Sequence, residues 1–420
     1  MKAVISPSSL FGTVSAPPSK SAGHRSLICA ALSDGVVKIE NLGESNDMTS
    51  TINALTALGA TVKRDGLTAT LTPVKHNNKD LTIDFLESGS TARFLIPVAA
   101  ALGCENITFC GQGRLPERPF GTIAKVLRDN GVACSSDTLP MTVSGQLKPG
   151  KFTLPGDISS QYISGLLLAL SIIKGESEIL LSTPLQSKDY VLMTINELRT
   201  FGAEIEIFED KFTVKGKPSL NATDRTVEGD WSQAAFHLVA GAIGGEVTVT
   251  GVDINSLQGD KEIVELLRRF GAEITVDGNN VTAKKSHLKA IQIDASQIPD
   301  LVPILAVAAS FAEGETVIYN AERLRIKESD RLLETALRLK AFGINVTETN
   351  DGLRIIGGKT KGADINSAND HRIVMAFSVM ASCSKGMSTI ENAEAINKSY
   401  PLFFKDFLSL GGECNVINNR

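Results

Sequence analysis

Basic side chains gather in a few short segments of a chain whose formal net charge is −5. Arginine suits bidentate contact with phosphate or carboxylate, and lysine supplies a mobile point charge. Such segments in an acidic protein therefore indicate substrates that carry several negative charges. The segments are GQGRLPERP (residues 111–119), LQSKDY (185–190), RLRIKESDR (323–331) and INKSYP (396–401).

Six further segments place helix-capping residues directly before strongly apolar stretches. Helix N-termini carry unsatisfied N–H donors and the positive end of the helix dipole, so they bind anions readily. For any single serine or aspartate, capping alone is the more common role, at roughly two in three, and a lone surface Lys or Arg is usually just solvated. The segments are SKSAGHR (19–25), ESGSTAR (87–93), DISSQ (157–161), GDWSQ (229–233), IPD (298–300) and NDHR (369–372).

An internal repeat must position these segments. A glycine between the end of a helix and the start of a strand recurs with spacings of 72, 71, 69, 72 and 68 residues, which predicts six repeats of about 70 residues. The positive φ that a helix end often requires explains the choice of glycine. The six positions are Gly59, Gly131, Gly202, Gly271, Gly343 and Gly411.

Each repeat combines two kinds of helix with β-rich strands. One helix is apolar all round and must be covered on every side, whereas the other is striped and packs on a surface. The sequence therefore predicts an α/β fold of the inside-out kind, with apolar helices at the centre of each domain and sheets and striped helices around them. Hairpins such as AEITVDGNNVTAKK (272–285) are expected to close most repeats.

The repeats predict two domains with three repeats each. The last repeat stops at GGECNVINNR without room for a hairpin partner, while the chain starts with a spare strand, KAVISP. If this strand completes the sixth repeat, one domain is discontinuous and comprises residues 1–17 plus 228–420. The other domain comprises residues 18–227 and holds repeats one to three.

Composition excludes several classes of protein. The negative net charge argues against a general nucleic-acid or acidic-membrane partner. The six cysteines form no CxxC pair, and with five scattered histidines they show no metal-ligand spacing. No apolar run is long enough to span a bilayer, and the first residues lack the pattern of a signal peptide. We expect a cytoplasmic protein whose cysteines are buried, reduced thiols.

Seven segments, taken in order, resemble the signature segments of the EPSP synthase family: SKSAGHR, SGSTAR, RLPERP, SSQY, RIKESDR, NDHR and NKSYP. The resemblance covers the whole chain. It implies two inside-out α/β domains of the enolpyruvyl transferase kind, with the active site in the interdomain cleft. It also implies transfer of the enolpyruvyl group of phosphoenolpyruvate to the 5-hydroxyl of shikimate 3-phosphate, a step of the shikimate pathway toward chorismate and the aromatic amino acids.

The resemblance also assigns ligand contacts, motif by motif. The residues implied for shikimate 3-phosphate are Lys20, Ser21, Arg25, Ser159, Ser160, Gln161, Ser187, Asp300 and Lys327. Those implied for phosphoenolpyruvate are Lys20, Gly89, Arg118, Gln161, Arg331, Arg372 and Lys398. One departure is Arg323, which stands where many relatives have Asn.

The expected reaction needs proton transfers but no metal or cofactor. The hydroxyl must lose a proton as it attacks C2 of phosphoenolpyruvate, and C3 must gain one. Asp300 is the predicted base, while Glu328 and Lys20 are candidates for proton delivery to C3. A tetrahedral intermediate would then lose phosphate.

Two other functions stay open at this point. UDP-N-acetylglucosamine 1-carboxyvinyltransferase shares the fold and the donor, but its family has a loop cysteine five residues before an Arg-Pro, where Gly113 stands here. A non-catalytic binder of the same fold would lack acid–base groups, yet Lys20, Asp300 and Glu328 are present. We expect small-molecule substrates as the only partners and a monomer, because the family implies closure within one chain.

Overall fold

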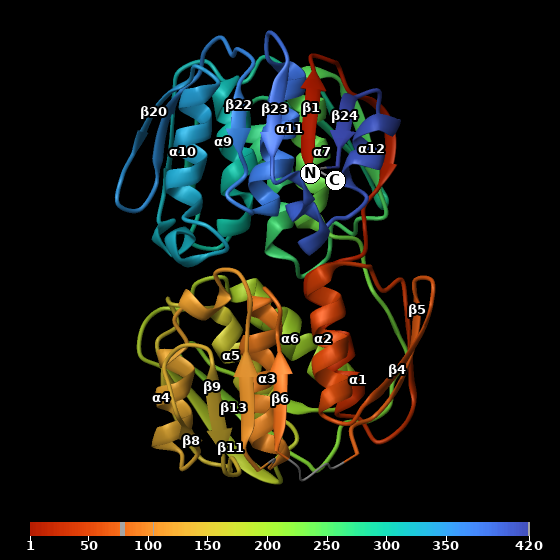
Figure 1. The fold of residues 1–420 in the computed structure, drawn as a ribbon, viewed down its shortest axis with the longest axis vertical. Coiled ribbons are helices and arrows are strands. Elements are labelled where there is room, and N and C mark those ends of the chain that lie inside the picture. Colours follow the sequence, from red (N-terminus) through yellow and green to blue (C-terminus); the bar gives the residue numbers. More distant parts are fainter. Residues whose placement is uncertain (76–79, 104, 419–420) are drawn as a thin grey trace. The chain divides into compact units, whose positions relative to one another are not determined.

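The computed structural model describes residues 1–75, 80–103 and 105–418. By its internal contacts the chain separates into two compact units, which Figure 1 draws as ribbons. The continuous unit comprises Pro18–Val227. The split unit comprises Met1–Pro17 together with Glu228–Arg420.

Three four-stranded sheets in each unit share one topology. In every sheet the first two strands run parallel and the next two are added antiparallel. The sheets of the continuous unit are β14 (Arg225–Thr226), β3 (Val37–Glu40), β5 (Thr68–Thr72), β4 (Thr61–Asp65); β6 (Leu81–Asp84), β7 (Ile107–Cys110), β9 (Met141–Ser144), β8 (Ala133–Cys134); and β10 (Lys151–Leu154), β11 (Gly175–Leu181), β13 (Lys211–Gly216), β12 (Glu204–Ile207).

The split unit repeats this arrangement with strands from both ends of the chain. Its sheets are β2 (Phe11–Ser15), β15 (Glu246–Thr250), β17 (Asn280–Lys284), β16 (Glu273–Asp277); β18 (Gln292–Asp294), β19 (Glu315–Tyr319), β21 (Leu353–Ile356), β20 (Asn345–Glu348); and β22 (Asp364–Asn366), β23 (Ser388–Glu391), β1 (Lys2–Ser6), β24 (Glu413–Ile417). Figure 1 shows the red strand β1 between the blue strands β23 and β24, so the sixth sheet needs the N-terminal strand.

The two kinds of helix differ in burial. All residues of α7 and α9 are buried, whereas half of α2 faces solvent or the rim of the core. The six apolar helices are α1 (Lys20–Ala31), α3 (Gly89–Leu102), α5 (Ser160–Leu170), α7 (Trp231–Gly244), α9 (Val302–Ser310) and α11 (His371–Cys383). The striped helices are α2 (Asn46–Ala57), α4 (Gly121–Asp129), α6 (Lys188–Thr200), α8 (Ile263–Arg269), α10 (Arg331–Ala341) and α12 (Phe403–Ser409).

Short 3₁₀ turns complete the chain between these elements. They are η1 (Leu115–Glu117), η2 (Gly259–Glu262), η3 (Pro299–Leu301), η4 (Glu322–Ile326) and η5 (Ala393–Lys398). Most of them occupy the segments that precede or follow a strand and lead to a helix, which is where the sequence places its basic residues.

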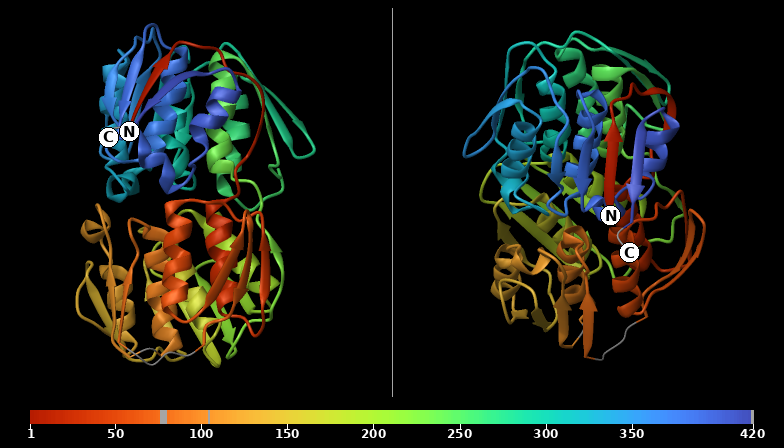
Figure 2. Two further views of the ribbon diagram at one scale, coloured as in Figure 1. Left: turned by 45° about the vertical axis from the view of Figure 1, so that its right-hand side comes forward. Right: turned by 45° about the horizontal axis from the view of Figure 1, so that its top comes forward.

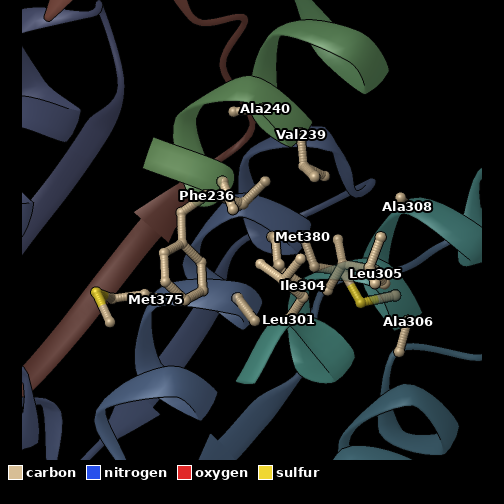
Figure 3. Packing of buried hydrophobic residues seen from close by; sticks show 14 of the residues in the cluster. Phe236, Val239, Ala240, Leu301, Ile304, Leu305, Ala306, Ala308, Met375 and Met380 are labelled. Carbon is tan, nitrogen blue, oxygen red and sulfur yellow. The ribbon is translucent and has the colours of Figure 1, made fainter. Parts of the chain in front are cut away.

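Each unit has its own hydrophobic core around its three apolar helices. Figure 3 shows Phe236 of α7, Ile304 of α9 and Met380 of α11 directed toward one another. These three helices contact one another, and α7 and α9 also contact strands such as β15 and β21. Figure 2 shows the helices and strands of this unit, mostly green to blue, from two further sides. In the continuous unit α3 and α5 pack so closely that a Cβ at Gly165 would lie 2.3 Å from the carbonyl oxygen of Arg93.

The cysteines depart from the sequence expectation. Among the described cysteines only Cys29 is fully buried, while Cys110, Cys134, Cys383 and Cys414 are partly exposed. Cys110, Cys134 and Cys414 lie in the strands β7, β8 and β24, and Cys383 is the last residue of α11. All five are free thiols, and Cys104 lies outside the described residues. None of the described helices is long and apolar enough to cross a membrane.

A buried histidine should make the split unit sensitive to mild acid. His237 of α7 is 1% exposed and its Nε2 lies 3.1 Å from the Tyr400 hydroxyl. Burial lowers the pKa of His237 from 6.5 to about 4. Because the unfolded chain takes up this proton near pH 6.5, the stabilisation is complete above that pH and is lost as the pH falls toward 4.

We predict that His237→Gln lowers the free energy of unfolding at pH 7.5. Between pH 7 and pH 5, the free energy of unfolding should then fall less steeply in the variant than in the wild type, by on the order of 1 kcal/mol per pH unit. Urea unfolding at several pH values measures this slope. The control is His287→Gln, because the His287 side chain is 76% exposed. A slope that is the same in His237→Gln and the wild type would contradict the prediction.

Candidate active site

The N-terminal ends of the three apolar helices of the split unit lie together. Ser232, in the first turn of α7, hydrogen-bonds the Asp260 carboxylate of η2. Asp260 in turn feels the charges of Asp300, just before α9, and of Arg372, in the first turn of α11. The repeat thus brings equivalent helix starts of the split unit to one place.

Asp300 is the centre of a cationic cluster in this unit. Its Oδ1 lies 2.9 Å from Nη1 of Arg331 and 3.7 Å from Nζ of Lys327, and its Oδ2 lies 3.2 Å from Nη2 of Arg372. Arg372 also donates to the Asp300 carbonyl at 3.0 Å. The structure therefore brings together four of the predicted site residues, contributed by η3, the end of η4, α10 and α11.

Arg331 is held by three carboxylates although only 1% of it is exposed. Besides Asp300, it donates from Nη2 to Glu328 at 2.7 Å and from Nε to Asp370 at 2.8 Å. Asp370 also caps α11, accepting from the backbone N–H of Arg372, and accepts from the Ser329 hydroxyl. The sequence analysis placed Asp370 in a capping segment but did not name it as a site residue, because its partner Arg331 is 39 positions away.

The charges of this cluster shift the pKa of its members. Burial acts to raise the pKa of Asp300, but Arg372, Lys327 and Arg331 hold it well below its usual range. Burial lowers the pKa of Lys327 to about 8, although Asp300 opposes that change. Burial and the negative charge of Asp300 raise the pKa of Asp260 to about 6. The cluster thus holds an ionised carboxylate among cations, beside a second carboxyl group that protonates close to neutrality.

Two further basic residues lie near this cluster. The Lys398 Nζ, at the end of η5, donates to the carbonyl oxygen of Asn369 at 2.6 Å, directly before Asp370. Arg323 donates to the carbonyl oxygen of Ser296 at 2.6 Å, which anchors η4 to the loop before η3. Asn369 itself has a φ of 56°, a left-handed conformation that turns the chain into α11.

In the continuous unit, the start of α1 carries Lys20, Ser21 and Arg25. The Lys20 Nζ pairs with Oδ2 of Asp47 at 2.6 Å, a carboxylate at the start of α2 that the sequence analysis did not single out. Arg25 is buried and donates to Thr194 at 2.8 Å, to the Ser21 carbonyl at 2.7 Å and to the Tyr190 carbonyl at 2.8 Å. Burial lowers its pKa to about 10, so the guanidinium stays charged at neutral pH.

The predicted phosphate-binding serines lie at two helix starts. Ser159 is the N-cap of α5 and accepts from the Gln161 N–H, while Ser160 is the first residue of that helix. Ser187 precedes α6 with a φ of 52°, and its carbonyl accepts from the Tyr190 N–H. A left-handed serine costs about 1–3 kcal/mol and is most often retained at functional sites.

Gly89, Arg118 and Gln161 form a third group, also in the continuous unit. A Cβ at Gly89 would lie 2.6 Å from Nη1 of Arg118 and 2.8 Å from Nη1 of Arg93. Gln161 accepts from Arg93 at 2.9 Å and donates to the Ser90 hydroxyl at 2.8 Å. A side chain at this position would therefore displace the ends of both arginine side chains at the start of α3. The sequence analysis missed Arg93 as a site residue.

Both units therefore present cations, serine hydroxyls and N–H groups at helix starts, an arrangement suited to phosphate and carboxylate groups. The described residues contain no group of three or more His, Cys, Asp or Glu side chains that could hold a metal ion. That the reaction needs no cofactor stays a prediction.

Comparison with known proteins identifies the family. A model of the family described as EPSP synthase (3-phosphoshikimate 1-carboxyvinyltransferase) matches residues 4–407. The chain belongs to the EPSP synthase family. The 3-phosphoshikimate 1-carboxyvinyltransferase of Clostridium novyi (strain NT) is 44% identical over 422 residues, which cover 97% of each protein. That of Clostridium acetobutylicum is 44% identical over 418 residues, with the same coverage.

This member of the EPSP synthase family is a transferase with 3-phosphoshikimate 1-carboxyvinyltransferase activity. A solved structure of EPSP synthase from Acinetobacter baumannii superimposes with a TM-score of 0.81 at 29% identity, covering 99% of this chain and 100% of that one. The enolpyruvyl transferase NikO from Streptomyces tendae superimposes equally well, with a TM-score of 0.81 at 21% identity over 99% and 98% of the two chains. NikO supports the fold alone. Together these structures confirm the predicted fold class.

The buried pair of Arg331 and Asp370 predicts a large loss of stability when one partner is removed. We expect Asp370→Asn to lower the free energy of unfolding by on the order of 3 kcal/mol, because Arg331 keeps its charge with one carboxylate fewer. Urea denaturation measures the difference. The control is Glu315→Gln, whose partner Arg354 is 52% exposed, so a change below about 1 kcal/mol is expected. Equal losses in both variants would contradict the prediction.

Proposed function

We propose that the residues described above, some in the continuous unit and some in the split unit, bind the two substrates and carry out the reaction of this EPSP synthase family member. The observation that carries the proposal is the cluster in which Lys327, Arg331 and Arg372 surround the Asp300 carboxylate. Three cations around one partly buried acid can bind an anionic donor and still leave a proton acceptor in place. The proposed reaction transfers the enolpyruvyl group of phosphoenolpyruvate to the 5-hydroxyl of shikimate 3-phosphate and releases phosphate.

For shikimate 3-phosphate we propose a site built mainly from the starts of α1, α5 and α6. Ser159, Ser160 and Ser187 would hold the phosphate at two helix N-termini, where N–H groups point toward an anion. A guanidinium has five N–H groups, and three of those of Arg25 reach protein acceptors, which leaves two for a substrate. Lys20, Ser21 and Gln161 would complete the contacts from the continuous unit, and Asp300 and Lys327 those from the split unit.

For phosphoenolpyruvate we propose contacts with both groups of basic residues. Gly89, Arg118, Gln161 and Lys20 would bind through the continuous unit, and Arg331, Arg372 and Lys398 through the split unit. The two arginines of the split unit present several N–H donors, a geometry that suits a planar carboxylate. This assignment is supported by the motif resemblance and by the burial of Arg118, Arg331, Arg372 and Lys398.

We propose that Asp300 accepts the proton of the attacking hydroxyl. In the structure its neighbouring cations make it a weak base. A substrate carboxylate that binds Arg331 and Arg372 would offset part of their positive charge and thereby raise the pKa of Asp300. Binding of phosphoenolpyruvate would thus make Asp300 a stronger base, as proton transfer from the hydroxyl requires.

The remaining steps follow from the balance of bonds. As the hydroxyl oxygen bonds to C2, the electrons of the C2–C3 double bond take a proton at C3, which Glu328 or Lys20 would supply. The tetrahedral intermediate then loses phosphate, and loss of a proton from C3 restores the double bond. A cytoplasmic location and a monomeric state remain predictions.

The acceptor decides between the two enolpyruvyl transferase functions. We predict that the purified protein releases phosphate from phosphoenolpyruvate when shikimate 3-phosphate is present and does not do so with UDP-N-acetylglucosamine. A coupled phosphate assay with each acceptor measures this directly. Release with the UDP-sugar would support the alternative transferase, and binding of both substrates without release would support a non-catalytic binder.

The proposed proton-transfer roles of Asp300 and Glu328 predict that replacing either residue lowers turnover. We expect Asp300→Asn and Glu328→Gln to lower kcat by about 10²–10⁴-fold, the usual contribution of a positioned proton-transfer group. Steady-state kinetics measure kcat, and substrate-binding titrations show whether the variants still bind their substrates. Asp277→Asn, at the exposed end of strand β16, is the matched control and should keep wild-type kcat. Wild-type kcat in Asp300→Asn would exclude Asp300 as the base.

A further inference from the structure

Arg93 is a buried cation that no carboxylate pairs with in the described part of the chain. It is 4% exposed, its hydrogen-bond acceptor is the side-chain oxygen of Gln161, and its Nε has no hydrogen-bond partner. Its guanidinium carbon lies 5.5 Å from the ring centroids of both Phe120 and Tyr162. The Arg93 guanidinium therefore packs on two aromatic faces instead of pairing with a carboxylate. Its positive charge is left to be neutralised by an anionic ligand.

The contact with Arg93 decides which way the Gln161 amide faces. A guanidinium carries only donors, so the atom of Gln161 at 2.9 Å from Arg93 must be the oxygen. The amide nitrogen then lies on the other side, where it donates to the Ser90 hydroxyl at 2.8 Å. Arg93 thus makes Gln161 and Ser90 present hydrogen-bond donors beside Gly89, which suits an anionic ligand.

Arg93 also joins the two segments that carry the neighbouring ligand groups. Phe120 follows the Arg118–Pro119 pair, and the Tyr162 hydroxyl donates to the carbonyl oxygen of Pro119. Both rings pack on Arg93, so this one side chain contacts the start of α5 and also the segment that carries Arg118. The Nη1 atoms of Arg93 and Arg118 both pack against Gly89.

We propose that Arg93 is a positioning residue for phosphoenolpyruvate, which fixes the Gln161 amide and supports Arg118 without itself being a catalytic residue. The inference rests on the proposed function of the site. It assigns a role to the stacked, planar guanidinium and not to its charge alone, so lysine should not replace it.

The first test compares Arg93→Lys with the wild type. Loss of a charge-assisted hydrogen bond predicts an increase in KM for phosphoenolpyruvate of about tenfold to a hundredfold. KM for shikimate 3-phosphate should change by a smaller factor, because Gln161 is only one of its proposed contacts, and Arg25 and Ser159 hydrogen-bond other partners. Arg128→Lys, a partly exposed helix arginine of the same unit, is the control and should keep wild-type values.

Two further measurements separate positioning from a merely structural role. In the Gln161→Ala background, Arg93→Lys should raise KM for phosphoenolpyruvate by a smaller factor than in the wild type, because its effect passes through Gln161. Guanidinium ions should partly restore the activity of Arg93→Ala, whereas the same concentration of sodium chloride should not. Strictly multiplicative effects and no rescue would overturn the inference.

A binding assay keeps this inference distinct from the proposed function. Phosphoenolpyruvate is titrated calorimetrically in the presence of shikimate 3-phosphate that lacks the 5-hydroxyl, so no turnover occurs. Binding by the wild type that weakens at least about tenfold in Arg93→Lys supports the role of Arg93. Equal binding by both proteins would overturn this inference alone, and no binding by the wild type would overturn the proposed function with it.

Discussion

The complete burial of apolar helices is the constraint on which the rest of the structure depends. A helix such as α9, with every residue buried, leaves no face for solvent, so strands and striped helices must surround it. Each unit has three apolar helices, and most of their residues are buried in its core. The proposed site residues therefore lie at two kinds of turn that the repeat supplies in each unit. One kind is the start of an apolar helix, and the other is the segment that leads to a striped helix.

This placement sets up an electrostatic conflict that the carboxylates resolve. Cations at the start of a helix face the positive end of its dipole, which disfavours them. In the split unit Asp300, Glu328 and Asp370 neutralise Arg331 and its neighbours, and Asp370 is also the cap of α11. The continuous unit handles Arg93 differently, with two aromatic rings and an amide oxygen. The carboxylates around Arg331 neutralise its charge without a ligand. The rings and the amide oxygen around Arg93 carry no net charge, so its positive charge is not neutralised by them.

Much of this organisation could be predicted from sequence, because the relevant signals are local or periodic. The repeated glycines and the contrast between apolar and striped helices predict the inside-out α/β fold, and the comparisons confirm that fold class. The motifs predict Asp300, Lys327, Arg331 and Arg372, which the structure brings into contact. The roles assigned to these residues stay predictions.

The partners of these residues could not be predicted, because they come from distant parts of the chain. Arg93 and Gln161 are 68 positions apart, and the aromatic rings that hold Arg93 are ordinary core residues by sequence alone. The expectation of buried thiols was wrong for four of the five described cysteines. Three of them lie in strands, where burial depends on which face packs on the core, and Cys383 lies at the end of α11. The place of Asp47 beside Lys20 likewise needs the packing of α1 on α2.

The position of β1 between β23 and β24 has a consequence for biosynthesis. The ribosome makes β1 long before its two neighbours, so the sixth sheet cannot close until the segments that carry β23 and β24 have emerged. The continuous unit is fully translated by residue 227 and can fold while the rest is being made. Through that interval the first strand keeps two unsatisfied edges, and its Lys2 and the short length of the strand limit the risk of pairing with another nascent chain.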